Sequence, residues 1–246
     1  MDRFWTEGKA LYGGWCSIPD PFLAEVMGAS GFDWVCVDMQ HGLVAKGDVV
    51  GMLQALDRTG TPTIVRVPWN DPAPIMWALD AGAQGVIVPM VNDAQSARAA
   101  VAACRYAPDG VRSWGPVRAA LLSGADEPSE TNRRVLCMVM IETVEAIEHL
   151  DEILDVEGIE GVFIGPSDLA VSLGDDPREP PTARHEEAID TIIATCRDRD
   201  VLAGIFCLDV ERARRYGEKG YRLLNLQSDA RMLRDRATAM LAEVRG

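Results

Sequence analysis

Five side chains of catalytic type occur in the same sequence context, at or just after the end of a short apolar run. Asp38 and His41 follow the run GFDWVCV in VDMQHG, and Arg66 follows the apolar residues of TPTIVRV. Glu142 closes VLCMVMIE, and Asp168 follows GVFIG in FIGPSDLA. A histidine near a carboxylate is suited to proton transfer. An arginine adds no stability to a strand of Val and Ile, so Arg66 is a candidate for stabilising negative charge during a reaction.

Glu142 and Asp168 form a candidate metal site, because they follow consecutive apolar runs. Two carboxylates held close together repel unless a cation or a proton lies between them. Hard oxygen ligands with open positions suit Mg²⁺ or Mn²⁺. No HxH, HExxH or clustered Cys/His pattern offers a better zinc site. We therefore predict a divalent metal at Glu142 and Asp168.

The elements that must hold these residues follow one repeat. Eight short apolar runs alternate with stretches of helical spacing, such as Val49, Met52, Leu53 and Leu56. Glycines precede several runs, in ASGFDWV, DAGAQGVIV, VEGIEGVFI and EKGYRLL, where a helix must end in the left-handed conformation. Apolar strands that alternate with amphipathic helices indicate a covered parallel sheet, and eight units predict an α/β fold, a closed (β/α)8 TIM barrel. The predicted strands span residues 14–18, 33–38, 61–67, 85–90, 135–142, 161–165, 201–206 and 221–227.

The carboxyl ends of the strands carry the chemistry in this fold, so the five residues are expected to converge on one rim. Taken singly, each has an ordinary explanation. Asp38, for example, could cap a helix, and Glu142 could be a carboxylate favoured near a helix N-terminus. Their shared location favours a site.

Two long polar segments interrupt the repeat. Residues 107–134 and 174–184 are rich in Gly and Pro, and we expect them to wall the mouth of the barrel. His149 and His185 lie in charge-rich helical stretches and are expected to be solvated. Trp114 is equally consistent with stacking on a substrate and with plugging the mouth.

Length and composition narrow the class of protein. The 246 residues, 48% of them hydrophobic, suit one domain spanning residues 1–246. A formal net charge of −14 leaves no basic stripe, so a small molecule is the expected partner rather than nucleic acid or a membrane. Six scattered cysteines without CxxC are expected to be reduced core residues. The N-terminus MDRFWTEGKA lacks the apolar region of a signal peptide, and no segment approaches the roughly 20 apolar residues of a membrane span. We expect a cytoplasmic protein.

The site residues suit cleavage of a carbon–carbon bond that leaves an enolate. A divalent ion and Arg66 would stabilise the enolate oxygen. The common alternative is a lysine Schiff base inside the barrel. That route is disfavoured, because the only lysines are Lys9, Lys46 and Lys219, and none falls in a predicted strand.

The motifs VDMQHG, VRVPW, ALDAGAQGVIVPMV, MIET and FIGPSDLAVSLG, in this order between about Trp15 and Asp229, resemble the HpcH/HpaI aldolase family. These are metal-dependent class II pyruvate aldolases, exemplified by 4-hydroxy-2-oxoheptanedioate aldolase. The resemblance implies a phosphoenolpyruvate/pyruvate-type barrel. It also implies reversible cleavage of 4-hydroxy-2-oxo acids to pyruvate and an aldehyde through a metal-stabilised pyruvate enolate, with Mg²⁺, Mn²⁺ or Co²⁺ as cofactor.

The resemblance assigns roles to the rim residues. Glu142 and Asp168 would hold the metal, which pyruvate would chelate through its carboxylate and keto oxygen. Arg66 would lie against the keto oxygen. Asp38 and His41 would handle protons, with the histidine oriented by the aspartate.

Further residues gain roles only from the resemblance. The backbone near Pro166 and Ser167 would receive the substrate carboxylate, and Trp15 would belong to the substrate-binding residues. Asp80 would reach the active site of a neighbouring subunit, in a hexamer built as a trimer of dimers with an exchanged C-terminal helix.

The chain departs from the family pattern at two positions. Gln40 stands where many members have a glutamate, and Met140 stands where a glutamine often precedes the isoleucine–glutamate pair. Both flank the expected metal, so its affinity and preferred ion are expected to differ.

Two other functions stay open. An acyl-CoA lyase of the related citrate lyase-like type would need a basic groove for nucleotide phosphates, which the acidic composition disfavours. A non-catalytic ligand-binding barrel would tolerate loss of the rim residues, which are all present.

Overall fold

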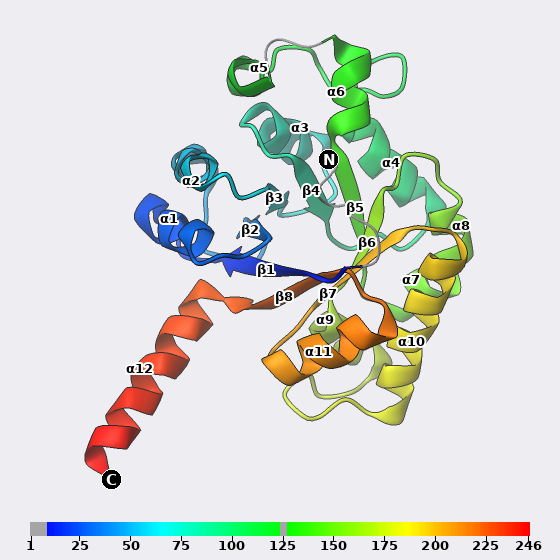
Figure 1. The fold of residues 1–246 in the computed structure, drawn as a ribbon. Coiled ribbons are helices and arrows are strands. Elements are labelled where there is room, and N and C mark those ends of the chain that lie inside the picture. The colour runs from blue at the N-terminus through cyan, green and yellow to red at the C-terminus, as the bar shows by residue number, and fades with distance from the viewer. Residues whose placement is uncertain (1–8, 124–126) are drawn as a thin grey trace.

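Eight parallel strands close into a barrel in chain order, as the (β/α)8 prediction requires (Figure 1). The computed structural model describes residues 9–123 and 127–246. The expected domain of residues 1–246 therefore includes two stretches, 1–8 and 124–126, that lie outside the described residues. The strands are β1 (Leu11–Cys16), β2 (Trp34–Asp38), β3 (Thr63–Arg66), β4 (Gly85–Val88), β5 (Leu136–Ile141), β6 (Gly161–Ile164), β7 (Leu202–Phe206) and β8 (Leu223–Ser228).

Helices cover the outside of the barrel. Several begin at a side chain that accepts a hydrogen bond from the first turn, such as Asp71, Asp93 and Thr182. The helices are α1 (Pro21–Ala29), α2 (Lys46–Thr59), α3 (Pro72–Asp80), α4 (Ala94–Cys104), α5 (Val117–Ser123), α6 (Pro128–Arg134), α7 (Val144–Glu148), α8 (Leu150–Leu154), α9 (Pro166–Leu173), α10 (Ala183–Asp198), α11 (Val210–Lys219) and α12 (Asp229–Arg245).

The glycines predicted to end helices adopt the expected conformation. Gly31, Gly82, Gly158 and Gly220 have φ values of 88°, 103°, 92° and 106°. This region strains any residue with a Cβ, so glycine there lets the chain turn from a helix into the next strand.

The first strand differs from its prediction, since it spans Leu11–Cys16 and not residues 14–18. The main-chain N–H groups of Ser17 and Ile18 donate to the carboxylate of Asp229. These two residues therefore form a turn that is fixed to the start of α12.

Apolar side chains fill the inside of the barrel beneath the carboxyl rim. Trp15, Trp34 and Phe163 are at most 1% exposed and contact one another through their rings, with centroids 5.6–6.5 Å apart. A second layer of apolar residues lies between the strands and the helices. All six cysteines are buried and unpaired, as predicted.

The two long polar segments lie at opposite ends of the barrel. Residues 174–184 join α9 to α10 on the carboxyl side, as predicted. Residues 107–134 join α4 to β5, and thus lie at the amino ends of the strands, so the prediction that they wall the mouth is wrong. Within that segment Arg118 donates to the carbonyl of Ala81, at the end of α3. Trp114 is 55% exposed and packs against Tyr106.

The last helix, α12, leaves the barrel and projects away from it (Figure 1). Its first residue, Asp229, is buried, whereas Leu233, Met240, Leu241 and Val244 are exposed. No helix within the described residues is long and apolar enough to cross a membrane.

Candidate active site

Asp38 and Arg66 form a buried ion pair at the carboxyl ends of β2 and β3. They are direct partners in the register of the two strands, so their side chains project on the same side at the same height. The guanidinium donates from Nε to Oδ1 of Asp38 at 2.8 Å and from Nη2 to Oδ2 at 2.6 Å. The side chain of each residue is less than 10% exposed. Such a bidentate pair fixes the orientation of both groups.

Trp15 holds this pair from below. Its indole N–H donates to Oδ2 of Asp38 at 3.0 Å, and the Arg66 guanidinium lies 4.9 Å from the ring centroid. Trp15 is 1% exposed. In this structure Trp15 therefore supports Asp38 and Arg66, and its expected place among the substrate-binding residues stays a prediction.

Both members of the pair stay charged. Burial by itself raises the pKa of Asp38, but hydrogen bonds and charge from Arg66, with the bond from Trp15, outweigh it and lower the pKa below its usual value. Burial by itself lowers the pKa of Arg66, and Asp38 reverses this effect, so the net pKa is raised. The result is a permanent cation next to the candidate metal ligands.

His41 lies in the exposed turn after β2. Its main-chain N–H, like that of Gln40, donates to Oδ1 of Asp38, at 3.3 Å and 3.0 Å. Among the described residues no hydrogen bond joins the imidazole to a carboxylate. The predicted orientation of the ring by Asp38 is therefore not present, because Arg66 and main-chain groups occupy that carboxylate.

Glu142 follows β5 and is 1% exposed. Its Oε1 accepts a 2.8 Å hydrogen bond from the main-chain N–H of Met90, a residue with a φ of 56°. A non-glycine residue in this left-handed region is uncommon and tends to occur at functional sites. The other oxygen, Oε2, lies against Gly165, where any Cβ would collide with it. The carboxylate is thus positioned by the segments that follow β4 and β6.

Asp168 lies in the first turn of α9, exposed and close enough to Glu142 to influence its charge. Burial raises the pKa of Glu142 to about 7; the Met90 N–H opposes this shift, the charge of Asp168 adds to it, and Arg66 lowers it. A cation between the two carboxylates would relieve this unfavourable charge, so the donor set fits a divalent ion. Within the described residues no group of three or more His, Cys, Asp or Glu side chains gathers to hold a metal. A metal held by these two residues would keep open positions.

Pro166 and Ser167 begin α9 beside Asp168. Proline at the first helical position costs no hydrogen bond, because that N–H would have no partner within the helix. The positive end of the helix dipole points to the rim, which suits an anionic group of a substrate.

Asp80 is not brought to this rim. It ends α3, at the amino ends of the strands, and accepts a 2.6 Å hydrogen bond from Nη2 of Arg112. The Arg112 side chain is 1% exposed, and its guanidinium lies 4.4 Å from the ring centroid of Tyr106. In this chain Asp80 and the rim residues therefore lie at opposite ends of the barrel.

A family model described as HpcH/HpaI aldolase/citrate lyase matches residues 11–235. The chain belongs to this family. A hydroxypyruvate/pyruvate aldolase of Rhizorhabdus wittichii is 39% identical over 245 residues, which are 98% of this chain and 96% of that protein. A 4-hydroxy-2-oxo-heptane-1,7-dioate aldolase of Escherichia coli is 35% identical over 240 residues, 96% of this chain and 90% of that protein. The crystal structure of an HpcH/HpaI aldolase/citrate lyase family protein from Burkholderia cenocepacia superposes with a TM-score of 0.92 at 32% identity, covering 100% of this chain and 98% of that one.

The two departures from the HpcH/HpaI pattern occupy different environments. Met140 is 2% exposed and packs inside the barrel with the aromatic residues. The side-chain oxygen of Gln40 is buried without a hydrogen-bond partner in the described part of the chain. A buried acceptor without a donor is costly, and a bound molecule that donates a hydrogen bond to Gln40 would recover this free energy.

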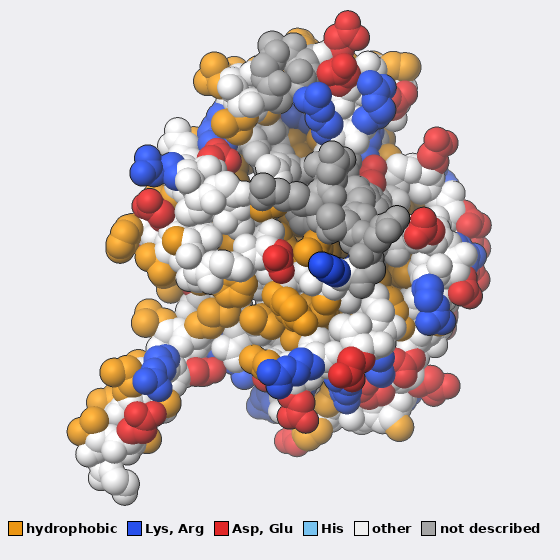
Figure 2. Space-filling model, viewed as in Figure 1, with side chains coloured by type: hydrophobic (Ala, Val, Ile, Leu, Met, Phe, Trp, Pro, Cys, Tyr) orange, Lys and Arg blue, Asp and Glu red, His pale blue; other side chains and the backbone are white. Residues whose placement is uncertain are grey.

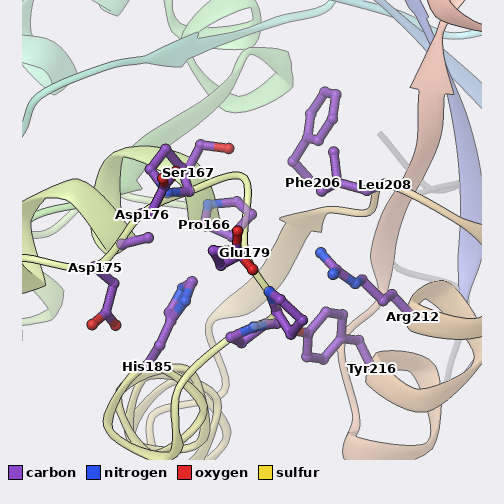
Figure 3. Close-up of a pocket in the computed structure, with 14 residues that line it drawn as sticks. Pro166, Ser167, Asp175, Asp176, Glu179, His185, Phe206, Leu208, Arg212 and Tyr216 are labelled. Atoms are coloured by element: carbon purple, nitrogen blue, oxygen red, sulfur yellow. The ribbon is translucent and has the colours of Figure 1, made fainter.

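A pocket lined in part by Ser167 lies beside the rim, and His185 is among its lining residues (Figure 3). His185 is 4% exposed, so the prediction that it is solvated is wrong. Its spacing to Ile189, Ile192 and Cys196 places it on the buried face of α10. This helical spacing indicates burial of His185, but the charged residues next to it in ARHEEAID suggest an exposed position.

Proposed function

We propose that the chain is a divalent-metal-dependent aldolase, an aldehyde-lyase, that reversibly cleaves 4-hydroxy-2-oxo acids to pyruvate and an aldehyde. Cleavage breaks the bond between C3 and C4 of the substrate. The 4-hydroxyl loses its proton as C4 becomes the aldehyde carbon. The bonding electrons form the enolate of pyruvate, which then takes a proton at C3. The chain must therefore stabilise an oxyanion and move protons.

The observation that carries this proposal is the environment of the Arg66 guanidinium. It is buried, fixed by Asp38, and close enough to Glu142 for their charges to influence each other. Preorganised donors of this kind stabilise an oxyanion that develops in the transition state. Arg66 would bind the keto oxygen of the substrate and then the enolate oxygen.

His41 would carry the protons. It lies at the same rim, and its ring is exposed. Without a carboxylate partner to fix it, the ring is able to move between the substrate and solvent. Asp38 would act on Arg66 and on the turn that holds His41, because its own oxygens are already occupied.

Glu142 and Asp168 would hold the divalent ion, which we propose to be Mg²⁺, Mn²⁺ or Co²⁺. When bound, the ion supplies Lewis-acid stabilisation of negative charge on the substrate oxygens. Pro166 and Ser167, at the positive end of α9, would receive the substrate carboxylate.

A chelation experiment tests this function. Chelator should abolish pyruvate release from a panel of 4-hydroxy-2-oxo acids with acidic, neutral and sugar-like tails, and Mg²⁺, Mn²⁺ or Co²⁺ should restore it. Glu142→Gln should require far more metal for the same rate, because it removes one ligand charge. Full activity after exhaustive chelation, or a substrate adduct trapped by borohydride, would contradict the proposal.

An acyl-CoA lyase is the second candidate, and the charge distribution disfavours it. The net charge of −14 offers little attraction to nucleotide phosphates. The named relatives at 35–39% identity are aldolases.

We further propose that the chain assembles into a hexamer, a trimer of dimers, through exchange of α12. The exposed apolar side chains along the projecting helix support this assembly (Figure 2). Leu233, Met240, Leu241 and Val244 recur at helical spacing, and such a stripe is usually buried against a partner. In the assembly Asp80 would complete the site of a neighbouring subunit. A cytoplasmic location is also proposed, supported by the six unpaired buried cysteines.

A further inference from the structure

A pocket lies beside the candidate active site, between α9, α10, α11 and the segment that joins α9 to α10 (Figure 3). We call it the α9–α11 pocket. Six of its lining residues matter here: Ser167, Glu179, His185, Phe206, Arg212 and Tyr216. In Figure 3 Ser167 and Phe206 lie on one side of the pocket, and His185 and Tyr216 lie on the opposite side.

The pocket lies next to the candidate catalytic rim. Ser167 immediately precedes the candidate metal ligand Asp168. The ring of Phe206 packs edge-on against Trp15, with centroids 5.2 Å apart, and Trp15 donates to Asp38. The end of a substrate that extends from the rim toward β6 and β7 would therefore approach the α9–α11 pocket.

His185 gives this pocket an unused polar group. The side chain is 4% exposed, and its ring projects into the pocket (Figure 3). Its Nε2 is buried without a hydrogen-bond partner in the described residues. Burial lowers the pKa of the imidazole, so the ring is neutral at neutral pH. A neutral ring nitrogen left without a partner costs free energy that a bound hydroxyl would recover, whichever nitrogen carries the proton.

The charged groups around His185 are predominantly acidic. The carboxylate of Glu179 extends into the pocket, and no hydrogen bond engages it among the described residues (Figure 3). Asp175 and Asp176 also line the pocket and accept hydrogen bonds from Thr182 and Arg178. Arg212 is the one cation in the described lining, and its Nε lies 3.4 Å from Asp209 outside the pocket.

The space itself is small. The cavity measures about 20 Å³, little more than the room that one water molecule needs. It therefore admits the end of a chain and not a whole substrate.

We propose that the α9–α11 pocket binds the far end of the aldehyde half of the substrate, and that it selects a terminal hydroxyl or hydroxymethyl group over a carboxylate. A hydroxyl has one donor and two acceptor sites. It can accept from Arg212 and then either donate to Glu179 while it accepts from a protonated Nε2 of His185, or donate to an unprotonated Nε2. A carboxylate is larger, and the carboxylates of Glu179 and Asp175 repel it, since Asp176 is paired with Arg178 and Arg212 lies near Asp209. This inference rests on the proposed aldolase function and names its substrate class.

The test uses the full-length metal-loaded protein in the direction of aldol addition, with pyruvate as donor. Acceptor aldehydes are compared in pairs of equal length that end in a hydroxymethyl group or in a carboxylate: glycolaldehyde with glyoxylate, 3-hydroxypropanal with 3-oxopropanoate, and 4-hydroxybutanal with succinic semialdehyde. The quantity measured is the ratio of kcat/KM within each pair. We expect the hydroxyl-ended aldehyde to be favoured by about tenfold or more at one length, as for a site that hydrogen-bonds a substrate hydroxyl.

Two variants test whether residues of the α9–α11 pocket determine the preference for the hydroxyl-ended aldehyde. Glu179→Gln, at an exposed position that does not endanger folding, should reduce the ratio about tenfold, because it removes one repulsive charge. His185→Leu should lower kcat/KM for the hydroxyl-ended aldehyde without improving the carboxylate-ended one. Glu187→Gln, an exposed glutamate of α10 outside the pocket, is the matched control and should keep the wild-type ratio.

Exchange of the pyruvate methyl protons with deuterium, followed by NMR without any acceptor, separates the two proposals. If wild-type protein catalyses neither exchange nor aldol addition, the proposed function fails, and this inference fails with it. If exchange and addition occur but the ratio is the same in wild type and Glu179→Gln, the aldolase function stands and the assignment of the pocket is overturned.

Discussion

Arg66 links Asp38 to the candidate metal ligand Glu142. Its guanidinium is fixed by Asp38 on one side and is electrostatically coupled to Glu142 on the other. A buried ion pair contributes little net stability, since desolvation offsets most of the attraction. The pair at this rim is therefore better explained by the chemistry it prepares than by folding. Trp15, which contacts both partners, fixes the geometry further.

Replacement of Arg66 tests oxyanion stabilisation, and replacement of His41 tests proton transfer. Arg66→Lys keeps a cation beside Asp38 but loses the bidentate fork, so retro-aldol cleavage and pyruvate methyl exchange should both fall by about 10²–10³. His41→Ala should slow both reactions by about 10²–10⁴, with affinity for metal and pyruvate nearly unchanged. NMR measures the exchange rate, pyruvate release measures the cleavage rate, and titrations with metal and with pyruvate measure the two affinities.

The metal titration decides between two roles for the histidine. Loss of metal binding in His41→Ala would mean that His41 is a ligand. Wild-type rates in both reactions would mean that VDMQHG is only the end of a strand.

At the scale of elements, the start of α12 supports the turns after β1 and β2, at the candidate active site. The buried carboxylate of Asp229 accepts from the main-chain N–H groups of Ser17 and Ile18 and from the Ser17 hydroxyl, at 2.6–3.1 Å. The carbonyl of Ser17 then accepts from Leu43 N, two residues beyond His41. The turns after β1 and β2 and the last helix are thereby held together.

Asp229→Ala should lower the free energy of unfolding by about 2–3 kcal/mol, because it leaves buried donors without an acceptor. Asp209→Ala is the matched control. Asp209 is exposed and caps α11 through one hydrogen bond, so its loss should cost about 1 kcal/mol. Urea unfolding of both variants measures the difference. Equal losses of unfolding free energy in the two variants would show that the buried hydrogen bonds of Asp229 contribute no more stability than an ordinary helix cap.

At the scale of the whole molecule, the described residues carry polar clusters at opposite ends of the barrel. Asp38, Arg66, Glu142 and Asp168 lie at the carboxyl ends of the strands, and Asp80 with Arg112 lies at the amino ends. A single barrel cannot bring the two ends together. An assembly in which one subunit's amino end meets its neighbour's carboxyl end would unite them.

Leu241→Asp on α12 should therefore dissociate the proposed assembly and reduce the proposed aldolase activity, because a charge in the apolar stripe opposes burial against a partner. Ala242→Asp is the matched control, since it introduces the same charge at the next residue, on the opposite face of the helix. Light scattering after size-exclusion chromatography and pyruvate release measure mass and activity. A wild-type monomer with full activity would contradict both the proposed exchange of α12 and the proposed role of Asp80.

Local patterns in the sequence determined the number of strands, the glycines that end helices and the rim residues. Helix and strand periods are set by neighbouring residues, and the carboxyl ends of parallel strands necessarily meet. The tertiary structure alone decided which groups bond there. Asp38 pairs with Arg66, and not with the nearby His41, because strand register places the first two side by side. The tertiary structure also decided that His185 is buried. The packing of α9, α10 and α11 surrounds it with apolar and charged residues that are distant in the sequence.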